Sequence, residues 1–154
     1  MSKKAWLNCI GCLIVGFAIG YFYAQAVIGK HIADYYASIN LIVLGESGNR
    51  AYRAYQHESS SVAIYALAEN LDKLKQAEDI GETPFISKQI LSIDLMLTHA
   101  RLAKLYAETG QTNLSSQHIV EALDYAKSGG KFSEITNQAA LMEMLAKFDK
   151  IKSQ

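Results

Sequence analysis

Residues Ala5 to Ile28 read AWLNCIGCLIVGFAIGYFYAQAVI, an uncharged stretch that decides the fold. Because a helix rises about 1.5 Å per residue, about 20 apolar residues are enough to cross a bilayer core roughly 30 Å thick. Lys3 and Lys4 precede the stretch and Lys30 follows it. The sequence therefore predicts a single N-terminal transmembrane helix, and we assign residues 1–30 to a membrane anchor.

A cleavable signal peptide is the alternative interpretation of the same stretch. Residues 1–4 would be its charged start, and the AQA of residues 24–26 matches the small-residue pattern of a cleavage site. Two features favour the anchor. The apolar region is longer than the usual ~7–15 residues, and the aromatic residues 21–23 stand where an interfacial belt would lie.

The lysine residues around the stretch predict its orientation. Lys3, Lys4 and the terminal amine precede it, whereas only Lys30 follows closely, with Asp34 soon after. Positively charged flanks of a membrane helix tend to stay on the cytoplasmic side. We therefore expect a single-pass protein with a cytoplasmic N-terminus. Its C-terminal domain would be extracytoplasmic, which means periplasmic if the source is Gram-negative.

Small or weakly polar residues recur every four positions along the predicted anchor. On a helix this spacing forms one narrow stripe, along which another helix can approach closely and pack. The alternative is that glycine and alanine are simply frequent in membrane helices. The predicted helix-pairing residues are Asn8, Cys12, Gly16, Gly20 and Ala24.

Residues 31–154 form one predicted soluble domain with a modest core. They carry 12 basic and 15 acidic residues, a net charge of about −3 with no basic tract. Nucleic-acid binding is disfavoured, because phosphate contacts need clustered lysine and arginine. Both cysteines lie in the N-terminal stretch, at Cys9 and Cys12. The soluble part therefore lacks a disulfide, a cysteine nucleophile and a thiolate metal site.

The soluble part reads as helical throughout, so we predict an all-α fold. Apolar residues recur at helical spacing, and glycine or proline separates the segments. We expect a break at residues 45–49 (GESGN), a possible bend at the serines of residues 59–61, a helix start at Thr83 and Pro84, and a cap at Ser133. The expected helices span residues 31–44, 50–77, 84–108 and 113–127, followed by a last helix after Ser133.

Residues 102–126 read LAKLYAETGQTNLSSQHIVEALDYA. Their large and small residues fall at the spacing of a tetratricopeptide repeat, and this segment resembles one such repeat. Ser115 departs from the alanine of that motif, and no proline follows the second helix. The resemblance implies a helix–turn–helix, ended in its first half by Gly110, and implies protein or peptide binding. A small helical bundle with one repeat-like hairpin is the alternative to a true array.

Recognisable catalytic chemistry is missing from the sequence. His57 and Glu58 lack the second histidine of a zinc-protease motif. His118 and Glu121 are one helical turn apart, but no facing carboxylates accompany them, so a solvated face is the favoured interpretation. His99 lies among apolar residues and is expected to be hydrogen-bonded and partly buried. We predict no enzyme activity, no cofactor and no metal site.

Tyrosine is the one enriched residue type that suggests a function. Tyrosine is frequent at protein interfaces because it buries a large area and keeps a polar tip. The alternative is that these rings fill gaps between helices and near the membrane surface. The candidate interaction residues are Tyr35, Tyr36, Tyr52, Tyr55 and Tyr65.

These features together predict a membrane-anchored helical module for protein–protein interaction, acting as an accessory or assembly subunit of a membrane-associated complex. Its expected partners are the lipid bilayer and another protein, contacted through the membrane helix and the helical domain. Two alternatives remain. One is an immunity-type or secreted protein that captures a partner, and the other is an enzyme or apolar-ligand-binding bundle without a recognisable motif.

Overall fold

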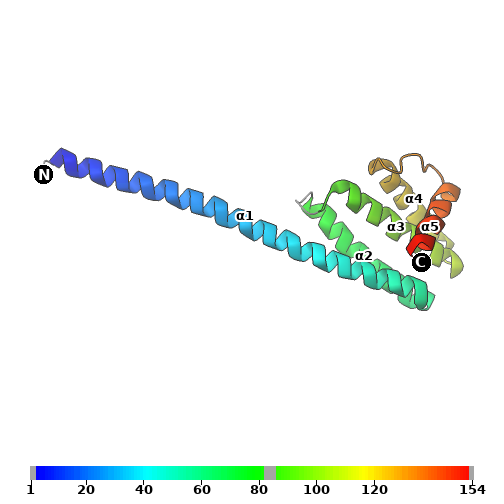
Figure 1. Ribbon diagram of the computed structural model, residues 1–154. Helices are drawn as coiled ribbons and strands as arrows, with labels where there is room; N and C mark the ends of the chain where they lie inside the picture. The colour runs from blue at the N-terminus through cyan, green and yellow to red at the C-terminus, as the bar shows by residue number, and fades with distance from the viewer. Residues whose placement is uncertain (1–2, 82–85, 153–154) are drawn as a thin grey trace. The chain divides into compact units, whose positions relative to one another are not determined.

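The computed structural model describes residues 3–81 and 86–152, with the side chains of 3–14, 33, 37, 151 and 152 left out. These residues form helices and connecting segments without a β-sheet, so the predicted all-α fold is confirmed. Figure 1 shows the order of the helices along the chain. Their bounds are α1 Lys3–His57, α2 Ser60–Ile80, α3 Lys88–Glu108, α4 Thr112–Ser128 and α5 Gln138–Lys152.

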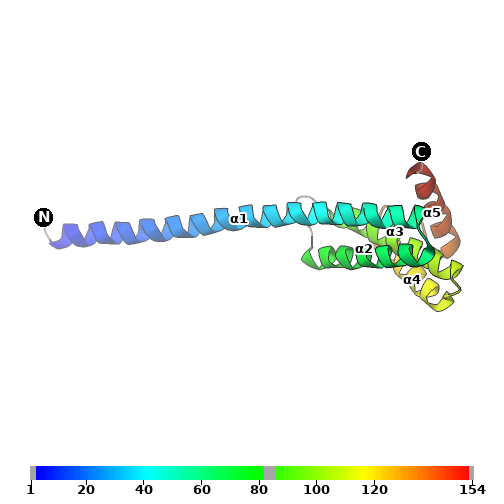
Figure 2. The ribbon, with the colours of Figure 1, turned by 90° about the horizontal axis from the view of Figure 1, so that it is seen from below.

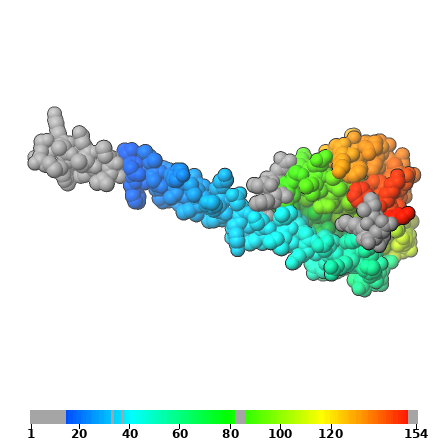
Figure 3. All heavy atoms as spheres, in the orientation of Figure 1, coloured from blue at the N-terminus to red at the C-terminus, as the bar shows by residue number. Residues whose placement is uncertain are grey.

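The chain divides into two compact units, Met1–Ser38 and Ile39–Gln154, called here the N-terminal unit and the helical domain. The N-terminal unit is helical from Lys3 onward, and Figure 3 shows its described side chains as a stretch one helix thick. Among the residues that the structure describes, none of the helices combines the length and apolarity needed to cross a membrane. The predicted span begins at Ala5, and its side chains up to residue 14 lie outside the described part. Both the span and a boundary after residue 30 stay predictions.

The predicted break at residues 45–49 is wrong, because α1 continues through both glycines of this segment to His57. Leu44 and Ala51, on either side of the glycines, pack into the core of the helical domain. Each glycine weakens a helix by only about 0.5–1 kcal/mol relative to alanine, so this packing outweighs the local preference. The helix ends instead at the serine run, where Ser59 has an extended backbone and α2 begins.

One half of the core lies between the C-terminal part of α1, α2 and α3. Figure 2 shows α2 running back beside α1, and α3 lies against both. Small residues at the contacts let the helix axes approach closely, while leucines fill the space between them. The buried residues of this half are Ala51, Ala63, Leu67, Leu71, Leu74, Ala77, Ile86, Leu91, Leu95, Leu102 and Leu105.

The other half of the core lies between α3, α4 and α5. It is built on a different face of α3, where Met96 and Ala100 point away from the leucines of the first half. Ala122 and Ala126 bring α4 close to α3, and α5 covers both helices with apolar residues such as Leu141. α3 is thus the shared element of the two halves, and twelve of its 21 residues are buried.

The helices α3 and α4 form the hairpin expected at residues 102–126. Gly110 has a φ of 77°, and the backbone N–H of Gln111 donates to the carbonyl of Tyr106 at 2.8 Å, which closes a Schellman motif. Ser115 replaces the alanine of the repeat motif without leaving a buried hydroxyl unpaired, because its Oγ donates to the carbonyl of Ala103 at 2.8 Å.

Two predicted helix starts are wrong. The cap of α3 is Ser87, whose Oγ accepts a hydrogen bond from the N–H of Ile90 at 3.3 Å. The predicted start signals Thr83 and Pro84 lie outside the described residues. At α5, the capping side chain is Asn137 rather than Ser133, since its Oδ1 accepts from the N–H of Ala140 at 3.0 Å.

Two glycines of the helical domain are expected to respond to alanine in opposite directions. Gly110→Ala places a side chain at positive φ and should lower the free energy of unfolding by about 1 kcal/mol. Gly45→Ala adds a methyl group to a helix where nothing lies within 4 Å, and should raise it by about 0.5–1 kcal/mol. Urea denaturation followed by circular dichroism measures both. A loss of stability in Gly45→Ala would contradict the continuous helix.

Candidate functional site

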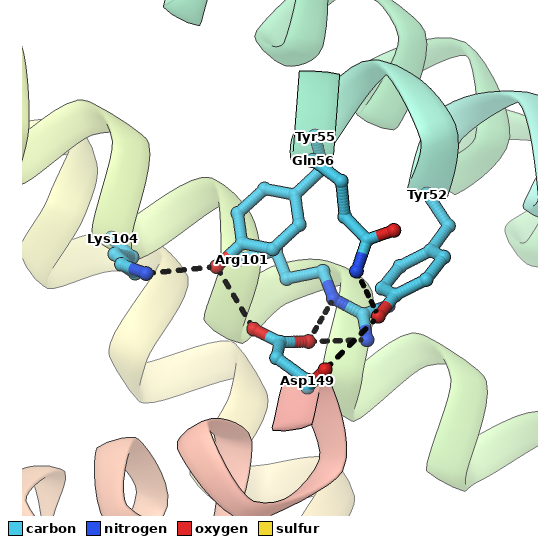
Figure 4. A network of polar contacts seen from close by, with 6 residues as sticks. All are labelled: Tyr52, Tyr55, Gln56, Arg101, Lys104 and Asp149. Carbon is cyan, nitrogen blue, oxygen red and sulfur yellow. Dashed lines mark hydrogen bonds and ion pairs between the residues drawn. The ribbon is translucent and has the colours of Figure 1, made fainter. Parts of the chain in front are cut away.

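A group of polar and aromatic side chains joins three helices of the helical domain, and we call it the polar cluster (Figure 4). α1 supplies three of its residues, α3 two and α5 one, although these helices are far apart in the sequence. The members of the polar cluster are Tyr52, Tyr55, Gln56, Arg101, Lys104 and Asp149.

Arg101 lies at the centre of the polar cluster and is only 7% exposed. Its Nη2 and Nε donate to the same carboxylate oxygen of Asp149, at 2.9 and 3.3 Å. The guanidinium carbon also lies 4.7 Å from the ring centroid of Tyr52 and 5.5 Å from that of Tyr55. A buried charge is tolerated only when it is paired and hydrogen-bonded, and Asp149 together with the two aromatic faces provides that pairing.

The tyrosine hydroxyls complete the hydrogen bonding of the polar cluster. The Tyr55 hydroxyl donates to Asp149 Oδ2 at 3.0 Å and accepts from Lys104 Nζ at 3.1 Å. The Tyr52 hydroxyl accepts from Gln56 Nε2 at 2.6 Å and donates to the carbonyl of Asp149 at 3.4 Å. These contacts bind the end of α5 to α1 and α3.

Burial raises the pKa of both Tyr52 and Tyr55 above the usual value, because a buried phenolate would lose its hydration. The hydrogen bond from its ammonium to Tyr55 raises the pKa of Lys104 as well. All three groups therefore keep their ordinary protonation at neutral pH, which does not suit a general acid or base. The geometry is that of a fixed polar contact between helices.

Only two of the five candidate tyrosines belong to the polar cluster. Tyr52 and Tyr55 belong to the polar cluster, whereas Tyr65 lies on the outer face of α2 and is 73% exposed. Tyr35 and Tyr36 are exposed in the N-terminal unit and contact each other edge to face. All three exposed rings remain available for a partner.

Sequence reasoning missed the two charged residues that organise the polar cluster, Arg101 and Asp149. A signal for Arg101 was present, since it follows His99 and Ala100 on the apolar part of its helix. A charge in such a place requires a partner. The partner itself has no local signal, because Asp149 stands 48 positions further along the chain.

The predicted helix-pairing stripe lies on α1 in the N-terminal unit. A side-chain carbon added at Gly16 or Gly20 would meet nothing within 4 Å, and Ala24 is exposed. The side chains of Asn8 and Cys12 lie outside the described residues. Pairing through this stripe stays a prediction.

A second polar contact, between His99 and His118, lies inside the α3–α4 hairpin. One Nδ1 donates to the other at 2.8 Å, and the two rings are flanked by the rings of Tyr125 and Tyr106. His99 is hydrogen-bonded as predicted, and it is almost fully buried at 1% exposure. His118 is half-buried and not fully on the solvated face that was predicted, because the buried ring of His99 and the stacked ring of Tyr106 hold it against α3.

Burial lowers the pKa of His99 to about 4, and the neighbouring His118 and Lys75 add to this effect. Burial also lowers the pKa of His118, partly offset by Glu121. Both histidines are therefore neutral at neutral pH. Within the described part of the chain, no group of three or more histidine, cysteine, aspartate or glutamate side chains could hold a metal ion.

The ion pair of Arg101 and Asp149 predicts a strong effect of one substitution. Asp149→Ala leaves the buried guanidinium without its carboxylate and should lower the free energy of unfolding by about 2–4 kcal/mol. Urea denaturation of both proteins checks it. Glu143→Ala is the matched control on the same helix, because Glu143 pairs with Lys147 on the exposed surface. Loss of this pair should leave the free energy of unfolding unchanged within error. Equal effects of the two substitutions would contradict the role of the polar cluster.

The buried histidine pair predicts a loss of stability on mild acidification. Since the pKa of His99 is about 4 in the folded state and about 6.5 when unfolded, the unfolded chain binds more protons between these values. Stability should therefore fall from about pH 7 to about pH 5 by about 1–3 kcal/mol, and change little from this source below pH 4. His99→Gln should flatten this dependence, whereas His57→Gln, which changes an exposed histidine, should leave it intact. An unchanged slope in His99→Gln would exclude the histidine pair as its source.

No protein-family model, curated protein or solved structure matches this chain. The resemblance of residues 102–126 to a tetratricopeptide repeat thus stays a likeness of one hairpin. The contacts and exposed surfaces of the chain itself are the basis for assigning a function.

Proposed function

We propose that the protein is a helical protein–protein interaction module held at a membrane by the N-terminal unit, acting as an accessory or assembly subunit of a membrane-associated complex. The observation that carries this proposal is the exposed apolar surface of the N-terminal unit. Phe17 is 79% exposed and Phe22 71%, and the apolar residues around them are exposed as well. The exposed apolar residues around Phe17 and Phe22 are Val15, Ile19, Tyr21, Tyr23, Val27, Ile28 and Ile32.

These side chains point in all directions around the helix axis. Successive residues of an α-helix are turned by about 100°, so that Phe17, Ile19 and Phe22 lie on different faces. A helix that is apolar all round is covered by lipid or by protein, because water would solvate it poorly. Lys3, Lys4 and Lys30 bracket the uncharged residues 5–28, which favours lipid and a cytoplasmic N-terminus.

The protein-binding part of the proposal has two supports. Tyr65 and Val62 are exposed on the outer face of α2, and a tyrosine beside an aliphatic residue is typical of an interface. Gly16 and Gly20 have open space beside them on α1, which suits close packing of a second helix inside a bilayer. In the polar cluster, the raised pKa values of Tyr52, Tyr55 and Lys104 do not suit a general acid or base at neutral pH.

The anchor is tested with two charge substitutions in the full-length protein. Ile19→Lys together with Phe22→Lys places two charges in the apolar stretch, each costing about 2.5–3.5 kcal/mol at the centre of a membrane helix. We expect the wild-type chain to remain in the membrane fraction after alkaline washing, with Met1 retained, and the double variant to be released.

The matched control makes the same chemical change in the helical domain. Val62→Lys with Tyr65→Lys replaces two exposed residues of α2 and should leave membrane retention unchanged. Release of the wild-type chain by alkaline washing, or a mature N-terminus at Val27, would contradict the anchor. Membrane retention of Ile19→Lys with Phe22→Lys would place the attachment elsewhere in the chain.

A further inference from the structure

The helical domain contains a cavity of about 250 Å³ between α1, α2 and α3. Its walls are mainly aliphatic, with leucines from all three helices. Polar or charged residues also line it, and these are Asn49, Tyr52, Asn70, Asp94, Thr98 and Arg101. A largely apolar cavity with a few convergent polar groups is the usual form of a small-molecule site. Its aliphatic walls are Leu41, Leu44, Leu67, Leu74, Ile86, Ile90, Leu91 and Leu97.

Two glycines of α1 leave the space that becomes this cavity. Gly45 and Gly48 both line it and stand one helical turn apart on the same face. A side-chain carbon at Gly48 would lie 3.8 Å from Oδ1 of Asn70, whereas at Gly45 it would meet nothing within 4 Å. Each glycine weakens the helix by about 0.5–1 kcal/mol relative to alanine. Larger residues at either position would project into the cavity.

Asn70 lines this cavity, and beside it the residue holds a buried acceptor that has no partner among the described residues. Its side chain is only 5% exposed, and its Nδ2 donates to Oγ1 of Thr98 at 3.4 Å. Its Oδ1 accepts no hydrogen bond from any described residue and faces α1 at Gly48. A buried polar atom without a partner costs about 1–3 kcal/mol, so a donor that reaches Oδ1 gains a strong interaction.

The charge of the cavity favours a neutral occupant. Arg101 lies at one end, but Asp149 already neutralises its guanidinium. Asp94, also in the wall, already interacts with another group, so it is not a free carboxylate. The requirements are therefore an apolar body and one N–H or O–H group directed at Asn70.

The size of the cavity limits that body. The cavity is open to solvent, since Leu41 and Ile90 in its wall are 42% and 56% exposed, and its volume of about 250 Å³ exceeds the about 150 Å³ that accepts benzene, so two fused rings fit. We propose that this cavity binds a neutral bicyclic aromatic group with one hydrogen-bond donor, of the indole type, with the donor on Oδ1 of Asn70. The group could belong to a free small molecule or to a tryptophan side chain of a partner, which share this chemistry.

The test compares indole with 1-benzothiophene, which has nearly the same shape but no N–H group. Binding to the full-length protein in detergent is measured by isothermal titration, with protein-free micelles as the blank for partitioning. We expect indole to bind at least about tenfold more tightly than benzothiophene, since a hydrogen bond of this kind contributes about 1.4 kcal/mol or more.

Two variants tie the preference to the cavity. Asn70→Leu should bind both rings with similar affinity, whereas Asn113→Leu, the same change at an exposed site on α4, should keep the preference for indole. Gly48→Leu should abolish binding of both rings while its melting temperature stays at or above that of the wild type. If Gly48→Leu fails to fold, Gly48→Ala provides a milder reduction of the space and should weaken the binding of both rings.

The source of the ring is resolved with N-acetyl-tryptophanamide, which carries the indole on a peptide-like backbone. If this compound binds, the ring comes from a partner's tryptophan. If the cavity binds indole but not this compound, the ring comes from a free small molecule. The proposal is overturned if the wild-type protein shows no saturable binding of indole at about 1 mM, the weak end of specific affinities. It is also overturned if indole and benzothiophene bind equally, because Oδ1 of Asn70 would then take no part in binding.

Discussion

The buried polar residues of α3 are the constraint on which the helical domain depends. α3 is covered by the other four helices, yet it carries Thr98, His99 and Arg101, all buried, within a single helical turn. Every such group needs a partner, because a buried polar atom without one is costly. Each neighbouring helix supplies a partner: Asn70 of α2 for Thr98, His118 of α4 for His99, and Asp149 of α5 with Tyr52 of α1 for Arg101.

These pairs explain why the helices pack in one arrangement. Leucine and alanine contacts alone tolerate small shifts of one helix along another, because dispersion has little directionality. Hydrogen bonds and ion pairs have narrow geometric limits, so a shifted helix would break the ion pair of Arg101 or the hydrogen bond of the His99 Nδ1. The apolar clusters thus supply most of the driving force, and the polar residues of α3 select the register.

Local patterns in the sequence predicted the helical class and the hairpin around Gly110. Apolar spacing and a glycine at positive φ act over a few residues, so they are visible in the sequence. The continuity of α1 through Gly45 and Gly48 was missed, since tertiary packing of Leu44 and Ala51 overrides the local cost of glycine. The polar cluster was not predicted: Tyr52 and Tyr55 were singled out as candidates for binding a partner, and the pairing of Arg101 with Asp149 depends on the complete fold. Tyr35, Tyr36 and Tyr65 share only the residue type with the tyrosines of the polar cluster, because their rings are exposed.

The position of Asp149 near the end of the last helix has a consequence for synthesis of the chain. Arg101 is translated 48 positions before its carboxylate, and Tyr55 is translated 94 positions before it. At about 5–20 residues per second, the guanidinium waits about 2–10 s on the ribosome for its partner. During that interval α1, α2 and α3 can already collapse around their leucines, with the arginine still hydrated at the edge. Docking of α5 then removes water from the guanidinium, so the register of this helix against α1 and α3 is fixed only after Asp149 has been synthesised.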